Sequence, residues 1–295
     1  MSYVLQAGEP AGAELARVMA EQSARLQAEC AAADDPAAFV RKARVRCKRV
    51  RAALRLARRR LGEPAFRREN GWWRDAARGL SDVRDARAAA DVLAGVAAEL
   101  EAEIGAAGIR RLDRRLSGRL SGRLSGGTAD GAPAGEAAAV AAFRSAMTAR
   151  EAAPRPAVGP AELAALRPED VAAALAEGYA AARAAMKAAM NDPRSEPFHE
   201  WRKQAKYHAL QARLGRLMFP ELESRVESGR TLARMLGAVQ DVEVLLAAVG
   251  GWTAAPRRLV PALEARRQGL MAEARAAGEE LFSARRREWL MELTG

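Results

Sequence analysis

The chain has 295 residues, of which 49% are hydrophobic, so it is long enough to form one large core or two ordinary ones. Its formal net charge of +11 and its pI of about 10.6 favour polyanionic partners. Alanine, arginine, leucine and glutamate dominate and β-branched and aromatic residues are sparse, which predicts an all-α protein. No segment is apolar for about 18 residues, and the N-terminus lacks a basic region followed by an apolar run. We therefore expect neither membrane insertion nor export.

The two cysteines, Cys30 and Cys47, both fall in expected helices and show no metal-ligand spacing. We expect reduced, partly buried thiols rather than a disulfide or a zinc site. This cysteine usage predicts a cytoplasmic protein.

The first half of the chain predicts long helices. Asp35 and Pro36 supply a carboxylate and a first-turn proline, and apolar residues then recur with a helical period until Gly62. A longer apolar pattern follows, in which Gly71 and Gly79 are candidate breaks. After residue 106 the motif Arg-Leu-Ser-Gly repeats, and each glycine costs a helix about 1 kcal/mol relative to alanine, so we expect a frayed helix that ends in a mobile linker. The expected helices span residues 13–33, 36–61 and 65–105.

The second half restarts the same helical pattern. Glu196-Pro197, Pro220 and Pro256 each open a helix, and the proline-rich stretch 152–160 is expected to be an extended connector. The expected helices span residues 134–150, 168–190, 196–218, 220–250 and 256–282, and a last helical piece ends at Leu293.

Charged positions recur along the chain in two sets, one at an offset of 156 residues and the other at an offset of 158. A change in loop length explains the difference. The repeat indicates a duplicated helical unit, with residues 1–150 and 151–295 as its two halves, and two such units would pack about a pseudo-twofold axis. The recurring positions are Arg74, Arg78, Leu80 and Asp85 with Arg230, Arg234, Leu236 and Asp241, and Arg41, Arg44, Lys48 and Arg55 with His199, Arg202, Lys206 and Arg213.

The second set forms a stripe of cations on one side of a helix. Counted from Arg41 or from His199, basic groups recur at +3, +7 and +14 in both halves, which places them within a sector of about 60°. Arg51 extends the stripe in the first half, and Lys203 lies on its flank in the second.

The segment 41–60 contains eleven cations and no carboxylate. A merely solvated helix face would carry glutamates four residues from its cations, because each like-charge pair at that spacing costs about 0.2–0.5 kcal/mol. The segment therefore needs an external polyanion, or carboxylates from elsewhere in the fold such as Asp75, Asp82, Asp85 and Asp241, to relieve its repulsion.

Four stretches resemble the two halves of a CHAD domain, the conserved-histidine α-helical domain. They are RKARVRCKRVRAAL, FRRENGWWRDAARGLSDVRDARAAADVL, FHEWRKQAKYHALQARLG and RTLARMLGAVQDVEVLLAAV. The resemblance spans about residues 14 to 285. It implies two four-helix bundles related by pseudo-twofold symmetry, a basic cavity or groove between them that binds inorganic polyphosphate, and association with polyphosphate granules.

Carried over by position, the resemblance makes His199 the family's histidine in the second half. Arg41 stands where the first-half histidine is expected, which retains a cation but not a neutral imidazole. His199 could instead be a packed or capping histidine, and Arg78 and Arg234 could form bridges to Asp82 and Asp241. The expected polyphosphate-binding residues are Arg41, Arg44, Lys48, Arg51, Arg55, Arg74, Arg78, His199, Arg202, Lys203, Lys206, Arg213, Arg230 and Arg234.

Two other classes of function compete with polyphosphate binding. Non-specific nucleic-acid binding is the first, although the basic helix lacks groups for reading adenine edges and lacks stacking platforms. Catalysis on triphosphate or polyphosphate is the second, because CHAD domains also occur fused to triphosphate-hydrolysing domains. Its nearest metal-binding look-alike, Glu99, Glu101 and Glu103, would splay around a helix. We therefore expect no catalysis, no cofactor and no metal, and we expect Trp72, Trp73, Trp201, Trp252 and Trp289 to serve packing.

Overall fold

The computed structural model describes residues 3–31, 35–125, 134–152, 158–192 and 195–294. Every regular element in these residues is a helix, which confirms the predicted all-α class. The elements are α1 (Ala11–Ala31), α2 (Pro36–Leu56), α3 (Arg58–Gly79), α4 (Ser81–Ser125), α5 (Ala134–Glu151), α6 (Pro160–Leu163), α7 (Pro168–Asn191), α8 (Ser195–Gly215), the 3₁₀ turn Pro220–Leu222, α9 (Glu223–Val249), α10 (Leu259–Leu281) and α11 (Arg286–Thr294).

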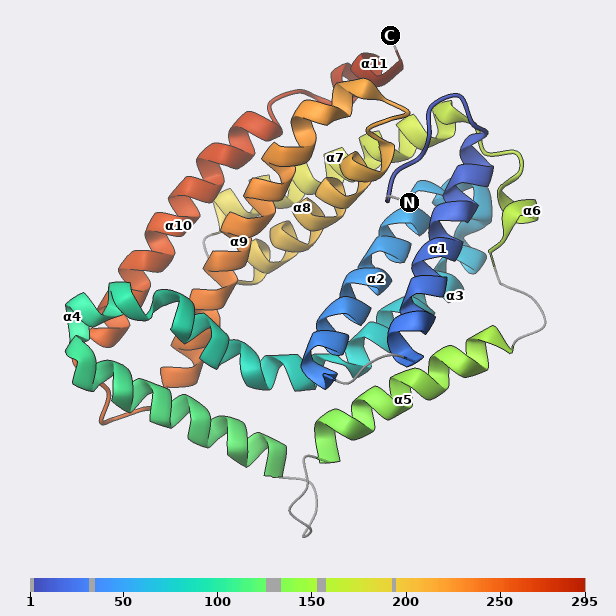
Figure 1. Cartoon of the computed structure of the whole chain (residues 1–295). Helices are drawn as coiled ribbons and strands as arrows, with labels where there is room; N and C mark the ends of the chain where they lie inside the picture. The colour runs from blue at the N-terminus through green and yellow to red at the C-terminus, as the bar shows by residue number, and fades with distance from the viewer. Residues whose placement is uncertain (1–2, 32–34, 126–133, 153–157, 193–194, 295) are drawn as a thin grey trace.

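The helices gather into two groups that lie side by side (Figure 1). In the first, α1, α2, α3 and α5 pack around Leu15, Leu26 and Phe39. In the second, α7, α8, α9 and α10 pack together and α11 covers one end of α7. Burial of these apolar faces is the main source of stability, at about 25 cal/mol per Å² of apolar surface. The two groups meet where α2 contacts α8, and the N-terminal segment reinforces this seam because Leu5 N donates to Leu214 O at 2.7 Å.

The long helix α4 runs from the first group to the second (Figure 1). It starts after a turn at Leu80 and changes direction at Gly105, whose φ of 69° lies in the left-handed region that glycine adopts without strain. On both sides of Gly105, α4 packs on α9 and α10. Leu100 and Leu112 form a separate apolar cluster with Leu245 there.

The predicted helices agree with the observed ones within a few residues, except at two breaks. The helix predicted to reach residue 61 ends at Leu56, and the chain turns at Ala57 and again at Gly62, whose φ is 73°. The long pattern breaks at Leu80, next to the candidate Gly79, but it runs through Gly71 unbroken. The Arg-Leu-Ser-Gly repeat stays helical up to Ser125. The predicted linker after it, and most of the predicted proline-rich connector, lie outside the described residues.

The tryptophans occupy packing positions, as predicted. Trp73, Trp201 and Trp289 are buried, and Trp72 and Trp252 are half-buried against the two apolar clusters. Cys30 is half-buried and Cys47 is buried, and both are free thiols. No helix in the described part of the chain is long and apolar enough to cross a membrane. The division into halves at residue 150, and a basic cavity between duplicated bundles, stay predictions.

Candidate anion-binding surface

The cationic stripe of α2 lies along the side of the helix that faces α3 and α8. Arg44 Nη1 donates to Ala77 O of α3 at 3.0 Å, and Arg51 Nε donates to Asn70 Oδ1 of α3 at 3.1 Å. The stripe is therefore held against the fold by polar contacts along its length.

Arg51 and Arg55 keep their charge among neutral partners. The Arg55 guanidinium lies 3.6 Å from the ring centroid of Tyr207 on α8, and it donates to Arg51 O at 3.0 Å and to Asn70 Oδ1 at 3.3 Å. Burial lowers the pKa of Arg55 and the Tyr207 side chain opposes this, while the nearby charge of Arg51 lowers the pKa further. Among the described residues, neither arginine forms an ion pair, although the charge of Arg51 reaches the carboxyl of Asp75 and lowers its pKa. This part of the seam therefore carries two cations without a directly bonded carboxylate.

Cations on other sides of the basic segment are partly neutralised by nearby carboxylates. Arg46 pairs with Glu29 of α1 at 2.8 Å, and Arg58, at the start of α3, pairs with Glu63 of the same helix at 2.9 Å. Arg59 pairs with Glu177 of α7. Ion pairs thus neutralise some cations of segment 41–60 but not Arg51 or Arg55.

The stripe of α8 begins at an exposed His199. Its Nδ1 lies 2.7 Å from Gln240 Oε1 of α9, so the histidine is neither a core residue nor a helix cap. Burial raises the pKa of Glu243 on α9, and the cations Arg267, His199 and Arg202 oppose this rise. The carboxylate of Glu243 therefore lies within the electrostatic reach of the α8 stripe. Lys203 forms an ion pair with Glu200 one turn before it.

Arg213, at the other end of the α8 stripe, is exposed and lies near Arg49 of α2. Burial lowers the pKa of Arg49, and the charge of Arg213 lowers it further. Under the offset of 158 residues, Arg55 matches Arg213 and Arg49 matches Tyr207. The Arg55–Tyr207 contact and the electrostatic effect of Arg213 on Arg49 therefore involve matched positions of the two halves, and the pseudo-twofold relation itself stays a prediction.

The remaining predicted arginines lie on α3 and α9 and are paired with carboxylates. Arg74 contacts Asp75 at 2.8 Å and Arg78 lies 4.0 Å from the same carboxylate. The hydrogen bond from Arg74 lowers the pKa of Asp75, and the charges of Arg78 and Arg51 lower it further.

On α9, Arg230 and Arg234 each lie 3.6 Å from Glu227. All four arginines of this set are at least half exposed. The predicted alternative partner Asp82 lies outside the described side chains, and the carboxylates of Asp75 and Glu227 take the role of bridging partners.

The other predicted residues are retained on the same two helices. Arg41 is exposed and forms no hydrogen bond or ion pair with the described residues. Arg44, Lys48, Arg202 and Lys206 are half-buried and make further polar contacts within the fold. The structure therefore places these cations on two adjoining helices, α2 and α8, where several of them already make contacts within the fold, as those of α3 and α9 do.

Sequence reasoning missed Asn70, Tyr207 and Gln240, which orient the cations. Tyr207 had a recognisable signal, because it occupies the position that matches Arg49 in the repeat and follows the basic run of α8. Asn70 and Gln240 carry no such signal, since a single amide on a polar helix face is common.

Comparison with known families gives a match to the CHAD domain over residues 17–226. This match covers more than half of the chain, from α1 to the start of α9. The chain belongs to the CHAD domain family. The matched region is shorter than the span of 14 to 285 inferred from the four stretches, and it leaves Arg230 and Arg234 outside. No curated protein matches the chain significantly.

The metal look-alike of α4 does not form a cluster. Glu99, Glu101 and Glu103 are all exposed, and Glu99 pairs with Arg266 of α10. Among the described side chains, no three histidine, cysteine or acidic residues are placed to hold a metal ion together. The absence of a cofactor and of catalysis stays a prediction.

Proposed function

We propose that this CHAD domain binds inorganic polyphosphate without hydrolysing it, through the cations of α2 and α8, in the cytoplasm and at polyphosphate granules. The observation that carries the proposal is the environment of Arg51 and Arg55. Their guanidinium groups are fixed by an amide, a backbone carbonyl and an aromatic ring, none of which cancels their charge. Family membership supports the same ligand class.

The chemistry of polyphosphate suits this surface. Each phosphate unit offers anionic oxygens that an arginine grips with two parallel donors and that a lysine meets as a point charge. A charge-assisted hydrogen bond contributes about 1.5–3 kcal/mol before desolvation is subtracted. The stripe from Arg41 to Arg55 extends about 21 Å along α2, so several successive phosphates of a flexible chain can follow it.

The structure gives nucleic acid less to bind than polyphosphate. Phe39 of α2 and Phe198, Trp201 and Tyr207 of α8 are all buried, so the aromatic rings of these two helices offer no exposed platform for bases. A surface that contacts only phosphate groups favours polyphosphate over nucleic acid, because polyphosphate has no bases that need a binding platform.

The decisive experiment compares polyphosphate affinity of the wild type with that of the charge-reversal variant Arg44→Glu/Arg202→Glu, which changes one cation in each half. We expect Kd to rise at least about tenfold, or about 1.4 kcal/mol, in calorimetric titrations with polyphosphate of defined length at fixed salt. The matched control is Arg60→Glu/Arg287→Glu, which removes the same net charge from two exposed arginines off the stripe. Equal affinity of the stripe variant and the control would remove the assignment.

Two further arms separate the competing functions. Duplex DNA should compete weakly with polyphosphate for the protein, and its competition should weaken further as the salt concentration rises. DNA that binds as tightly as polyphosphate across the salt series would favour the nucleic-acid function. Incubation of long-chain polyphosphate with the protein and magnesium should release no phosphate. Steady release above a heat-denatured control would show that the protein is an enzyme.

A further inference from the structure

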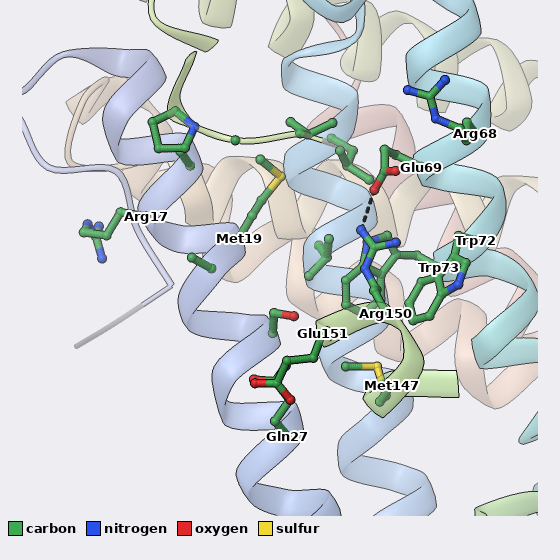
Figure 2. Close-up of a pocket in the computed structure, with 18 of the residues that line it drawn as sticks. Arg17, Met19, Gln27, Arg68, Glu69, Trp72, Trp73, Met147, Arg150 and Glu151 are labelled. Atoms are coloured by element: carbon green, nitrogen blue, oxygen red, sulfur yellow. Dashed lines mark hydrogen bonds and ion pairs between the residues drawn. The ribbon is translucent and has the colours of Figure 1, made fainter. Parts of the chain in front are cut away.

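A second potential binding site lies in the first helix group, where a cavity of about 1250 Å³ opens between α1, α3 and α5 (Figure 2). Pockets for small organic ligands usually measure about 300–1,000 Å³, so this cavity has room for one. Its apolar lining includes Met19, Val50, Leu54, Trp73 and Met147. Methionine side chains are flexible and polarizable, which suits ligands of variable shape.

The cavity exists because small side chains occupy positions where a packed bundle would place large ones. Ala13, Ala16, Ala20 and Ser23 follow one face of α1, and Ala146 faces the same space from α5. Ala13 and Ala20 are exposed, so the cavity opens to solvent along α1 and a ligand can enter it from that side.

The cavity lining combines paired and unpaired polar groups: Arg17 is ion-paired with Glu14 and Glu21, whereas the exposed Arg68 forms no hydrogen bond or ion pair with the described residues. Arg150 Nη2 donates to Glu69 at 2.5 Å, and the guanidinium lies 4.3 Å from the ring centroid of Trp72 (Figure 2). That bond uses one of the five N–H donors of the guanidinium. On the opposite wall, the half-buried Ser23 and Gln27 form no hydrogen bond with the described residues. These donors suit an acceptor such as a carboxylate.

The cavity is distinct from the cationic stripe. Val50 and Leu54 line it from α2, and at about 100° per residue they project roughly 60–180° away from the stripe residues, none of which belongs to the cavity lining. A ligand in the cavity therefore does not occupy the proposed polyphosphate surface.

We propose that this cavity binds an amphipathic organic carboxylate. The apolar body lies against the methionines and Trp73, and the carboxylate accepts hydrogen bonds from Arg150 and Gln27. The buried Glu69 is already compensated by its ion pair with Arg150, and the charge of the unpaired Arg68 offsets that of the exposed, solvated Glu151. This site is independent of the proposed polyphosphate binding.

The test uses decanoate as the probe and isothermal titration calorimetry on the full chain. We expect one decanoate to bind per chain. Ala20→Phe fills the cavity from α1 and should weaken binding at least about tenfold, or about 1.4 kcal/mol. Ala24→Phe is the matched control, because Ala24 is an equally exposed alanine one turn further along α1 that does not line the cavity. It should leave the affinity unchanged.

A probe with a similar alkyl chain but the opposite charge separates specific binding from adsorption to apolar surface. Decyltrimethylammonium carries the same chain with a cation, and we expect it to bind at least about tenfold more weakly than decanoate. Equal binding of the two amphiphiles, or equal loss in both phenylalanine variants, would overturn the proposal. Should Ala20→Phe fail to fold, Gln27→Leu removes a donor without adding bulk, and undiminished decanoate affinity in that variant would also overturn it.

Discussion

The two cationic stripes have the same spacing in the sequence but differ in what surrounds them. On α2, Arg51 and Arg55 contact an amide and an aromatic ring. On α8, Lys203 pairs with Glu200. Equal numbers of cations thus produce unequal fields, because a carboxylate within about 4 Å cancels much of a cation's potential. The first half is expected to supply most of the attraction for a polyanion.

The cores of the two halves differ at a matched position as well. His208 of α8 corresponds to Val50 of α2 under the offset of 158 residues. Both are buried, but the imidazole lies among Tyr179, Phe282 and Trp289 with neither ring nitrogen bonded to a described residue. The matched helices α2 and α8 therefore both carry a cationic stripe, but only the buried side of α8 carries a titratable imidazole at this position.

Acid should destabilise the second helix group through His208, and this is the largest effect we expect. Burial and, to a smaller extent, the nearby charge of Arg225 together lower the pKa of His208 to about 3. Below its ordinary value of about 6.5, the unfolded chain binds a proton that the folded chain rejects. Stability is therefore lost as pH falls from about 6.5 towards 3, by roughly 4 kcal/mol at the lower limit.

Urea unfolding followed by circular dichroism between pH 7 and pH 4 measures this loss. His208→Phe should flatten the pH dependence of the free energy of unfolding, whatever its effect at neutral pH. Identical slopes in the wild type and the variant would show that other groups cause the acid sensitivity.

Removal of the Arg55 side chain should cost more stability than removal of its repeat-related counterpart Arg213. Arg55 is half-buried and stacks on Tyr207 across the seam, and the desolvated cation–π contact and its hydrogen bonds contribute about 2–3 kcal/mol together. Arg213 is exposed, so Arg213→Ala should change stability by at most about 0.5 kcal/mol. Denaturant midpoints of Arg55→Ala and Arg213→Ala measure the difference, and equal shifts would contradict the asymmetry of the seam.

The fold class and the helix positions were predictable because helical periodicity and proline starts act locally. Pro36 opens α2 as predicted, whereas α9 begins at Glu223 and α10 at Leu259, shortly after the predicted starts at Pro220 and Pro256. The breaks were less predictable. Gly71 and Gly79 look alike in the sequence, yet α3 runs through Gly71 and ends at Gly79, since only tertiary packing determines where the chain must turn.

The candidate site was predictable in its cations and not in their partners. The stripe from Arg41 to Arg55 follows from spacing alone. Which cations are neutralised depends on carboxylates from distant segments, such as Glu29 for Arg46 and Glu177 for Arg59. The cavity beside Arg150 left no sequence signal either, because alanines on a helix face usually indicate close packing.

Removal of the carboxylate that pairs with the two arginines of α9 should strengthen polyphosphate binding. This is the smallest of the effects predicted here. Glu227→Gln removes the carboxylate that lies 3.6 Å from both Arg230 and Arg234. Exposed ion pairs contribute about 0.2–1 kcal/mol, so freeing two cations should lower Kd about threefold. The matched control is Glu223→Gln on the same helix, which removes the same charge but frees only Arg216 outside the predicted site. If both variants gain equally in titrations at fixed salt, net charge rather than position sets the affinity, and the difference between the two stripes has no bearing on binding.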